Sequence, residues 1–548
     1  MAVSNIVLNE WSNITLKGFA LAVLGLYIAF YVVKSFYRAF TSPLRHLPGP
    51  WYTKFSNVVL FWKVMAGQRS FYIDALHRKY GPTVRLSPNE ADFMDAESFK
   101  TIHHASSKFV KDPWYEAVNF LPRPTIFHVR DPKDHGERRK LLSKHLGTNQ
   151  VRQNFDAAVR RLCELCIQKM KRRSKEDPVV DLLDWARLVC SDILGLVVFG
   201  KPFGMLDIEK RTEHIRVLDT ALLFGGFTSE MPWLRAIGSR LPFKFFREGY
   251  GSVDFIMDGA YVAVESARNG DETCEVRTVL ASVLKDQQEN KDKGLRQWDD
   301  TDIQVEALSL LIAGAGATAT VLGFIWFVKL FLMMRIDADS AGRWQVLEMP
   351  DLQRKLEEEV AALPDDFNDA MLETQCPLLN ATILEGNRLW AGVPSSLPRV
   401  APPEGAILGG YQIPAGTTVC TQAYSMHRDA SIWPDPLKFD PTRFLPGADI
   451  HKDGRSLLSG FGAGAYACLG PSLAKMKMRY MSAMLFREFR GLKLGPKMPK
   501  LEEKNLITWI AIFPMDNKIF GDFSEVKYKE EARKDSATAE NVQLPIEA

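Results

Sequence analysis

The spacing of apolar residues predicts that most of this chain is helical. Hydrophobic side chains recur every three or four positions in several long stretches, which is the period of one face of an α-helix. The clearest are KDHGERRKLLSKHL, VRRLCELCIQKMKRR, DLLDWARLVCSDILGLVVFG and MPDLQRKLEEEVAAL. Alternating runs bounded by Gly and Pro predict short strands in PTVRLS, GAILGGYQIPAGTTVCTQAY and NLITWIAIF. Strands and helices do not alternate regularly, so we expect a mainly α fold with a small β component.

An apolar run near the N-terminus predicts a membrane anchor. Residues 14–33 carry a single charge, Lys17, close to their start, and a run of this length spans a bilayer as a helix. Basic residues follow at Lys34, Arg38 and Arg45, so the positive-inside rule places the rest of the chain in the cytosol. No small-residue cleavage site follows, and we therefore favour a retained anchor over a cleaved signal peptide.

These signals divide the chain into five segments. We expect a short lumenal N-terminus at 1–13, a transmembrane anchor at 14–34, a basic and proline-bearing hinge at 35–52, one large domain at 53–520, and a polar, disordered tail at 521–548. Residues 334–348 interrupt two helical patterns, as a loop or an error in the gene model would.

The composition argues against several classes of protein but does not itself indicate a function. The 548 residues are 46% hydrophobic and 25% charged, which is ordinary for a globular protein, and no Gly/Ser/Pro-rich linker divides the large domain. The net charge of +3 gives no reason to expect a nucleic-acid partner. Seven scattered cysteines suggest no disulfide framework and favour a reducing compartment. Cys163 and Cys166 lack a second Cys/His pair nearby, so we interpret them as ordinary thiols on a helix rather than zinc ligands.

The stretch LLIAGAGATAT, residues 310–320, has the spacing of a dinucleotide-binding loop, G-x-G-x-x-A. However, Thr301 and Gln304 form a capping-box pattern just before it, and apolar residues continue in helical phase into VLGFIWFVKLFLMM. No further βαβ units follow, which a nucleotide fold requires. We therefore predict one helix of over 30 residues, whose small mid-helix residues leave room for a flat ligand against the backbone.

The stretch SGFGAGAYACLGPSLAKM has the composition of a loop that presents a thiolate. Phe461, Gly464, Cys468 and Gly470 give the pattern F-x-x-G-x-x-x-C-x-G. A thiolate ligand to haem iron needs backbone N–H donors and a following helix N-terminus. Glycines supply the turns and allow close approach to a porphyrin, while an aromatic ring such as that of Phe461 can cover the sulfur. On this segment alone, a buried cysteine in a glycine-rich turn would be the better explanation.

Further motifs join this loop in a familiar order. Glu385 and Arg388 form E-x-x-R on one helical face, and Arg443 lies in FDPTRF before the cysteine loop. With the anchor and hinge, these motifs resemble the cytochrome P450 family over residues 16–513. Two longer stretches, GVPSSLPRVAPPEGAILGGYQIPAGTTV and YSMHRDASIWPDPLKFDPTRFLPG, are similar to fungal microsomal members that act in secondary metabolism.

The resemblance implies roles for individual residues. Cys468 would be the axial ligand of haem b, that is iron protoporphyrin IX. Three charged residues would form a buried triad that supports the haem-binding core: Glu385, Arg388 and Arg443. Three others would donate to haem propionates, anions that need donors in an apolar slot: His135, Arg139 and Arg399.

The chain departs from the family pattern beside the thiolate and along the cysteine helix. Tyr466 stands where the family usually has a propionate-binding arginine, so it offers one neutral hydrogen bond and haem retention would depend on Arg139 and Arg399. Lys477 stands where the family usually has glutamate, and Lys475 and Arg479 flank it. This basic group is either a solvated face or an added attraction for an acidic reductase.

A third departure concerns proton delivery. The family usually carries A-G-x-[DE]-T-[TS] in its long helix. One register places Thr318 on the acid and Ala319 on the alcohol, with Thr320 next; the other, beginning at 313–314, places Gly316 and Ala317 there. In both registers the acid is missing, which matters because a general acid contributes about 10²–10⁴ in rate. We expect Thr318 and Thr320 with ordered water, or a substrate hydroxyl, to supply the proton.

We therefore predict a haem-thiolate monooxygenase that crosses the endoplasmic reticulum membrane once and receives NADPH electrons from a membrane-bound reductase. Its substrate would be an apolar small molecule whose identity apolar walls do not specify. Residues 120–127 and 507–512 would add walls to a pocket lined by Ala313, Ala317, Val393, Leu397 and Ile510. Two alternatives stay open: a related enzyme that catalyses rearrangement, ring formation or coupling, and a non-catalytic haem-binding protein.

Overall fold

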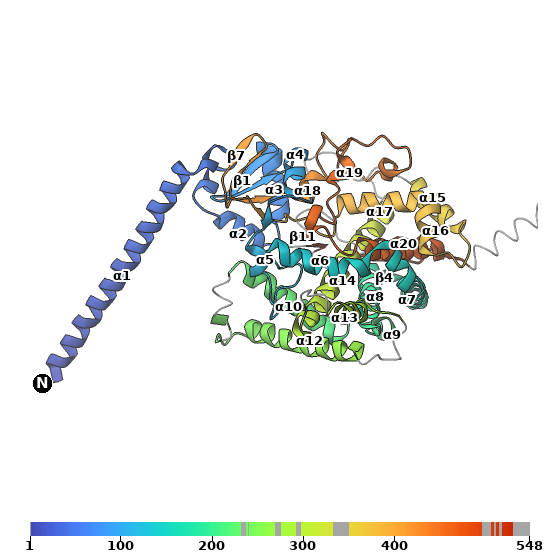
Figure 1. Cartoon of the computed structure of the whole chain (residues 1–548), viewed down its shortest axis with the longest axis horizontal. Helices are drawn as coiled ribbons and strands as arrows, with labels where there is room; N and C mark the ends of the chain where they lie inside the picture. The colour runs from blue at the N-terminus through green and yellow to red at the C-terminus, as the bar shows by residue number, and fades with distance from the viewer. Residues whose placement is uncertain are drawn as a thin grey trace, which may run out of the picture.

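A long N-terminal helix leads into a body built mostly of helices, with some strands near the end where that helix joins and others among the helices (Figure 1). In this computed structural model, the described residues are 2–231, 237–238, 240–268, 276–291, 297–331, 350–495, 506–508, 511–514 and 518–529. The interruption at 334–348 and the predicted pocket residue Ile510 lie outside them.

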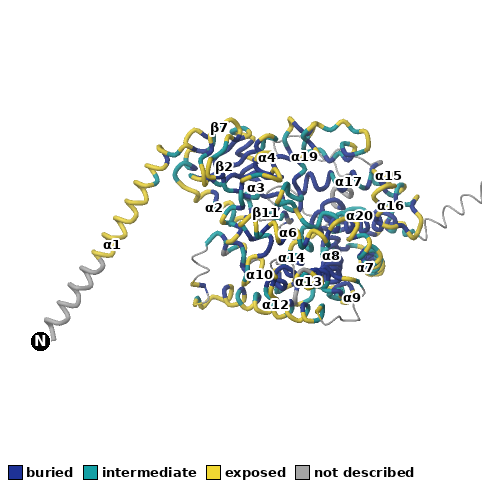
Figure 2. Tube along the Cα trace, in the orientation of Figure 1, coloured by how far each residue is buried: buried dark blue, intermediate teal, exposed yellow. Residues whose placement is uncertain are grey.

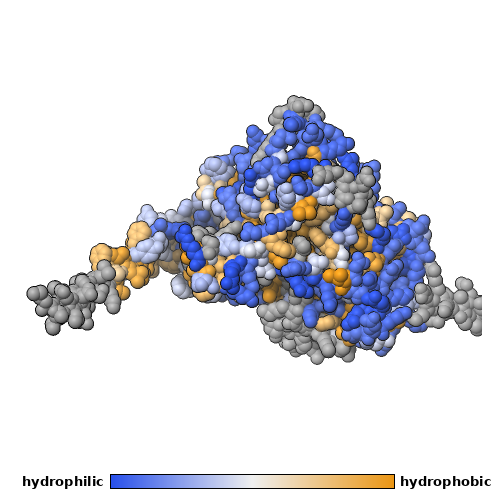
Figure 3. Space-filling view, turned by 90° about the horizontal axis from the view of Figure 1, so that it is seen from below, coloured by the Kyte–Doolittle hydropathy of each residue, from blue (hydrophilic) through white to orange (hydrophobic). Residues whose placement is uncertain are grey.

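Helix α1 spans Ala2–Thr41. Its part Gly18–Thr41 is long and apolar enough to cross a membrane, and its most apolar window is not buried against the body, as the exposed trace and the apolar surface show (Figures 2 and 3). Near its end, Ala39 is buried. The helix continues past residue 34, so the first part of the predicted hinge is helical. Its end is fastened to the body, because Ser35 Oγ donates to Phe55 O at 2.7 Å.

All four stretches with helical spacing form helices: α6 Pro132–Leu146, α7 Thr148–Glu176, α8 Leu182–Phe199 and α15 Pro350–Ala361. The other described α-helices of the body are α2 Val58–Met65, α3 Arg69–Tyr80, α4 Ala96–His103, α5 Trp114–Ala117, α9 Met205–Ile208, α10 Glu213–Ser229, α12 Lys244–Arg268, α13 Val279–Asn290, α14 Asp300–Phe331, α16 Asp369–Gln375, α17 Pro377–Leu389, α18 Ala423–Met426, α19 Gly454–Leu457 and α20 Pro471–Glu488.

Helix α14 is the predicted long helix, with 32 residues, and the glycine run lies inside it. Its N-cap differs from the prediction. The Asp299 carboxylate accepts from Asp302 N at 3.0 Å, so Asp299 caps the helix and Thr301 lies in the first turn. Asp satisfies free N–H groups and also favours the positive end of the helix dipole.

The strands form one larger sheet and several small ones, and all three stretches predicted as strands contain them. The five-stranded sheet has the order β1-β2-β8-β5-β3, with β2 and β8 parallel and its other pairs antiparallel. Its strands are β1 Thr83–Ser87, β2 Glu90–Phe93, β3 Val110–Lys111, β5 Arg399–Val400 and β8 Thr418–Cys420. The small pairs are β6 Ala406–Leu408 with β7 Tyr411–Ile413, and β11 Leu506–Thr508 with β12 Ile512–Pro514.

The predicted tail begins too early. β13 Phe520–Asp522 pairs with β4 Val179–Asp181 and with β10 Lys493–Leu494, and β14 Lys527–Tyr528 pairs with β9 Phe489–Arg490. Polar composition suggested disorder, but strands can satisfy their backbone groups against distant partners that composition does not reveal. Residues 530–548 lie outside the described part.

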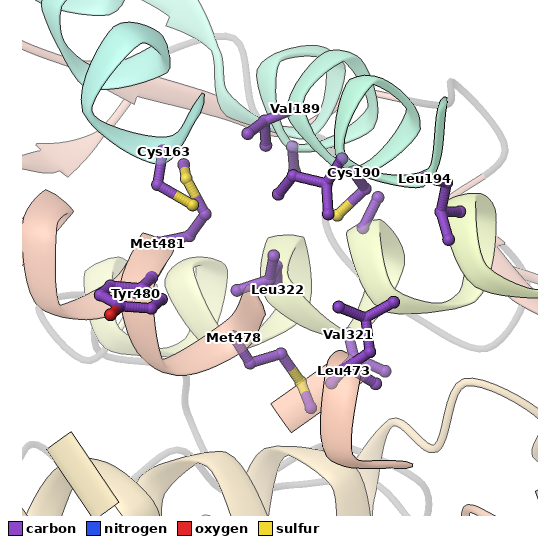
Figure 4. Close-up of a cluster of buried hydrophobic side chains, with 14 of the residues drawn as sticks. Cys163, Val189, Cys190, Leu194, Val321, Leu322, Leu473, Met478, Tyr480 and Met481 are labelled. Carbon is purple, nitrogen blue, oxygen red and sulfur yellow. The ribbon is translucent and has the colours of Figure 1, made fainter. Parts of the chain in front are cut away.

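The main core lies where α7, α8, α14 and α20 meet. Figure 4 shows Cys163, Cys190, Leu322 and Met481 pointing toward one another from these four helices. Cys163 and Cys166 are fully buried there, as the thiol interpretation predicts, and burial raises the pKa of both. This packing fixes α20, whose N-terminus carries the cysteine loop.

Candidate functional site

Cys468 ends a tight loop immediately before α20. Cys468 N donates to Phe461 O at 2.7 Å, which closes the loop on itself. Gly470, the N-cap of α20, directs its N–H at the Cys468 sulfur at 3.3 Å. Of the six cysteines in the described residues, Cys468 is the one whose side chain is exposed. The loop therefore presents an accessible sulfur to a backbone donor, as a thiolate ligand requires.

Opposing effects act on the Cys468 thiol. Burial by surrounding protein raises its pKa, while the Gly470 N–H and the charges of Arg139 and Lys477 lower it. A sulfur that is accessible yet partly desolvated lies in a recess rather than on the outer surface. Donors and cations around it favour the thiolate once the sulfur binds an electrophilic metal.

The two predicted site glycines serve different purposes. Gly464 has φ +62°, and a Cβ built on it would lie 1.9 Å from His103 O, so only glycine lets the loop pack against the end of α4. Gly470 has no atom within 4 Å of such a Cβ and contributes its N–H instead. The Phe461 side chain is partly buried against the main core, and its carbonyl is the group that contacts Cys468.

Basic side chains surround the Tyr466 ring. The His135 ring centroid lies 4.6 Å from that of Tyr466, Arg399 Cζ lies 4.8 Å from it, and Lys111 Nζ 5.1 Å. Arg139 Nη1 donates to Ala467 O at 2.6 Å. We call Lys111, His135, Arg139 and Arg399 the cationic cluster. The structure thus brings together the three predicted propionate donors and adds a lysine that the sequence did not indicate.

The cationic cluster lacks counter-charges. Burial and neighbouring cations lower the pKa of His135 to about 3 and that of Lys111 to about 7. None of its members forms an ion pair with a carboxylate within the part of the chain described, and Arg399 Nε is buried without a hydrogen-bond partner there. With these pKa values His135 is uncharged at neutral pH, and the charge of the cluster comes from Arg139, Arg399 and part of the Lys111 population. Buried cations are normally paired, so the cluster fits an anionic ligand. Two propionates beside a thiolate-bound iron match this set of donors.

The predicted charge triad is assembled. Arg388 holds the Glu385 carboxylate with two hydrogen bonds, at 2.7 and 2.8 Å, and both side chains are fully buried. Arg443 Nε lies 3.6 Å from Glu385. Arg388 also donates to the carbonyls of Pro436 and Lys438, so the pair fastens α17 to the segment that precedes the cysteine loop.

The exposure of α14 distinguishes the two registers of the acid–alcohol motif. Ala313 is exposed and the next four residues are half-buried, whereas Thr318, Ala319 and Thr320 are buried. The accessible stretch favours the register that begins at 313–314, which places Gly316 and Ala317 at the acid and alcohol positions. Thr320 Oγ1 is buried and has no hydrogen-bond partner among the described residues. A catalytic role for Thr318 and Thr320 stays a prediction.

Two predicted pocket residues line a cavity of about 10 Å³, which has room for about one water molecule, so the substrate pocket itself stays a prediction. Val393 and Leu397 line it together with Gly462 and Ala463 of the cysteine loop. Ala317 lies beside this wall, since a Cβ built on Gly392 would be 3.1 Å from the Ala317 Cβ. In the 120–127 segment, Phe120, Leu121 and Ile126 are buried in the main core, and a role of this segment as a pocket wall stays a prediction.

The basic group on α20 is not a solvated face. Lys477 is 1% exposed and Nζ donates to Gly314 O on α14 at 2.8 Å. Arg479 is buried against Asp369, to which Nε donates at 2.7 Å. Both readings of this group, as a solvated surface or as an attraction for a reductase, are therefore wrong for these two residues, because the core encloses them.

Two site residues escaped sequence reasoning. Lys111 belongs to no recognisable motif, and only the residues that surround it in the folded protein indicate a role. Glu306 is 2% exposed in α14, where Oε1 accepts from Ile126 N at 2.7 Å and from Arg138 at 2.8 Å. Burial raises its pKa to about 7. A carboxylate between Val305 and Ala307 in a mostly apolar helix was the signal that could have indicated it.

Comparison with known proteins agrees with this geometry. A family model described as Cytochrome P450 matches residues 48–511. Cytochrome P450 monooxygenase aflV of Aspergillus parasiticus is 33% identical over 512 residues, covering 92% of this chain and 96% of that protein. Cytochrome P450 monooxygenase cypX of Dothistroma septosporum is 32% identical over 508 residues, covering 91% and 95%.

A more distant relative and a solved structure extend the comparison. Methylphloroacetophenone oxidase of Cladonia uncialis is 30% identical over 424 residues, covering 73% of this chain and 85% of that protein. Retinoic acid bound cyanobacterial CYP120A1 superposes with a TM-score of 0.64 at 18% identity, over 81% of this chain and 92% of that one. That likeness shows the fold alone.

Proposed function

This chain belongs to the cytochrome P450 family and is a haem-thiolate monooxygenase, and from this premise we propose how it holds its cofactor, its electrons and its substrate. The cofactor is haem b, which when bound supplies the activation of dioxygen by two electrons. The electrons come from NADPH through a membrane-bound reductase. The enzyme is anchored in the endoplasmic reticulum membrane by α1, with its body in the cytosol.

The observation that carries this proposal is the pairing of the Cys468 loop with the cationic cluster. Cys468 offers an accessible sulfur with a backbone donor. His135, Arg139 and Arg399 converge beside it, and none has a carboxylate partner among the residues that the structure describes. In this proposal Cys468 ligates the iron and the basic residues receive the propionates. Because these basic residues already converge at one place, we expect binding of the propionates to require little rearrangement of their side chains.

The substrate is an apolar small molecule that the cavity wall orients. Val393 and Leu397 supply apolar contact, while Ser395 and Thr421 place hydroxyls nearby. Such a lining binds through excluded water and uses few polar groups to set orientation. Ala313 and Ala317 on α14 complete the apolar side.

A second reaction class is favoured by the accessible stretch of α14. Its five residues, 313–317, contain no acid and no hydroxyl, so this wall does not itself hold a transferable proton. One relative is named as an oxidase of methylphloroacetophenone, a phenol that carries its own hydroxyl protons. We infer that a phenolic or otherwise hydroxylated substrate supplies a proton here, and that oxidative coupling competes with oxygen insertion as the outcome.

The test of ligation is a carbon monoxide difference spectrum of the reduced holoprotein. Wild type shows the red-shifted Soret band of a thiolate-bound haem, and Cys468→Ser loses it. Cys376→Ala, a buried thiol at the start of α17, keeps the band as a matched control. A wild type without this band overturns the proposal.

The two reaction classes separate with labelled dioxygen. Reductase, NADPH and the aromatic intermediates of the neighbouring biosynthetic genes are incubated under ¹⁸O₂, and products are analysed by mass. Oxygen insertion places the label in product; coupling or ring formation yields oxidised, unlabelled product. If every product carries the label, coupling and ring formation are ruled out. If no compound of the panel is turned over in an NADPH-dependent way, both reaction classes are contradicted.

A further inference from the structure

We propose that Lys111 is a propionate donor that restores, from a strand, the positive charge missing at position 466. This inference rests on the proposed haem-binding function and concerns which of this chain's own residues secure the ligand. It assigns a binding role to a residue that no motif in the sequence marks.

Strand register brings Lys111 opposite another cation. In the antiparallel pair of β3 and β5, Lys111 lies directly across from Arg399. Like charges at directly opposite positions of a strand pair destabilise it. Both residues are also buried, at 3% and 2% exposure, where repulsion is poorly screened. An anion between them would turn this repulsion into a shared attraction.

The hydrogen bonds of Lys111 leave part of its capacity unused. Nζ donates to Ile126 O at 2.7 Å and to Phe127 O at 2.9 Å. An ammonium group carries three donors, so one is free to reach a ligand oxygen. The two carbonyls hold the ammonium in place and reduce the conformational entropy that binding would cost.

The position of Lys111 matches the role of the missing arginine. Lys111 Nζ and Arg399 Cζ lie 5.1 and 4.8 Å from the Tyr466 ring centroid. The tyrosine ring thus fills the place of a basic side chain and is contacted by two cations that approach from the sheet. Lys111 and Arg399 therefore keep positive charge beside position 466, although the arginine that the family usually has there is replaced by Tyr466.

Glu306 does not already neutralise Lys111. It attracts Lys111 electrostatically, but Arg399 and Arg139 repel it. The Glu306 carboxylate already forms an ion pair with Arg138, with Nη1 and Oε1 2.8 Å apart, and accepts a hydrogen bond from Ile126 N. Lys111 forms no ion pair with any carboxylate in the described residues, so the ammonium has capacity for a further anion.

The experiment measures how tightly the holoprotein holds haem, independently of catalysis. Ferric holoproteins are mixed with excess apomyoglobin, and haem transfer is followed by absorbance. Loss of a charge-assisted hydrogen bond predicts that Lys111→Met accelerates haem loss about tenfold to a hundredfold. Lys111→Arg, which keeps the charge, stays within about threefold of wild type. An unchanged rate in Lys111→Met overturns the inference.

A charge-relocation variant separates ligand binding from a purely structural role. In Lys111→Met/Tyr466→Arg, the family's arginine is returned to the loop, and we expect haem loss to slow again by tenfold or more. If Lys111→Met yields no holoprotein, recovery of holoprotein in the double variant supports the inference equally. If neither Tyr466→Arg nor Lys111→Arg restores retention, Lys111 has only a packing role and the inference is wrong.

The same samples distinguish this failure from failure of the proposed function. A wild type that shows the thiolate band while Lys111→Met retains haem normally disproves the Lys111 assignment alone. A wild type that shows no thiolate band disproves haem-thiolate ligation itself. The midpoint reduction potential gives a second readout, because removing a cation beside a propionate lowers it.

Discussion

The cysteine loop and the accessible stretch of α14 belong to the same site but are built in opposite ways. The loop is held at several points: by Gly464 against His103, by the Cys468 N–H on Phe461 O, and by Arg139 on Ala467 O. The stretch at 313–317 consists of Gly and Ala, and a Cβ on Gly316 would meet no atom within 4 Å. Charge gathers at the first and is absent from the second.

The difference indicates that the two regions serve different tasks: one holds the ligand and the other borders the place of reaction. Holding an anionic, flat ligand requires fixed donors, and the loop side supplies them even where a usual arginine is replaced by Tyr466. Delivering a proton requires a transferable hydrogen, and the α14 stretch leaves that to water or substrate. Retention of the cofactor and specificity of the reaction are therefore determined by different residues.

The largest effect is expected when the fixed region is disturbed. Gly464→Ala places a Cβ against the His103 carbonyl at positive φ, which we expect to cost about 2–4 kcal/mol and most of the thiolate-bound haem. Gly470→Ala is the matched control, since its Cβ has space, and it should cost below about 1 kcal/mol. Thermal unfolding and the carbon monoxide spectrum measure both. Equal losses in the two variants would remove the contrast between the glycines.

A smaller effect is expected when the open region is filled. Gly316→Asp/Ala317→Thr introduces an acid and an alcohol where space is available, so the protein should fold normally and direct up to about tenfold more NADPH into product instead of peroxide. Thr318→Asp/Ala319→Thr uses the other register and buries a carboxylate, so it should lose stability instead. Product and peroxide are measured per NADPH. Better coupling in the second variant than in the first would show that the register is wrong.

A third effect, confined to the pH profile, concerns Glu306, a buried carboxylate about two turns before the open stretch of α14. Its folded pKa of about 7 lies above the usual value of 4.5. The stability that it contributes is therefore present below pH 4.5 and is lost as pH rises to 7. Glu306→Gln should flatten the pH dependence of unfolding between pH 5 and 7.5 by about 1–3 kcal/mol.

The exposed pair Arg354–Glu358 provides a control for the pH series. Glu358→Gln should leave the unfolding profile within about 0.5 kcal/mol of wild type, because exposed ion pairs contribute little. A profile in Glu306→Gln that coincides with wild type would mean that Glu306 stays ionised throughout this range.

Local patterns predicted the helices and strands of this fold well but could not predict which distant segments contact one another. Helical and strand periodicity indicated α14, β1 and β8, and the E-x-x-R motif indicated the Glu385–Arg388 pair that the structure contains, because each depends on short spacing. The assignment of Cys468 as the iron ligand rests on motif order and stays a prediction. Lys111 depends instead on the pairing of β3 with β5, and the burial of Lys477 on how α20 packs against α14. These are contacts between distant segments, which no local period encodes. The strands beyond residue 520 were missed for the same reason.

The pairing of β4 with β13 has a consequence for the synthesis of the protein on the ribosome. Phe520 pairs with Asp181 but follows it by 339 residues, so at about 5–20 residues per second the ribosome needs about 17–70 s to supply the partner. Throughout that interval β4 has an unpaired edge, and Asp181 lacks the Ile519 N–H that it accepts in the finished molecule. Until residue 520 has been synthesised, this edge of β4 is open to pairing with other chains.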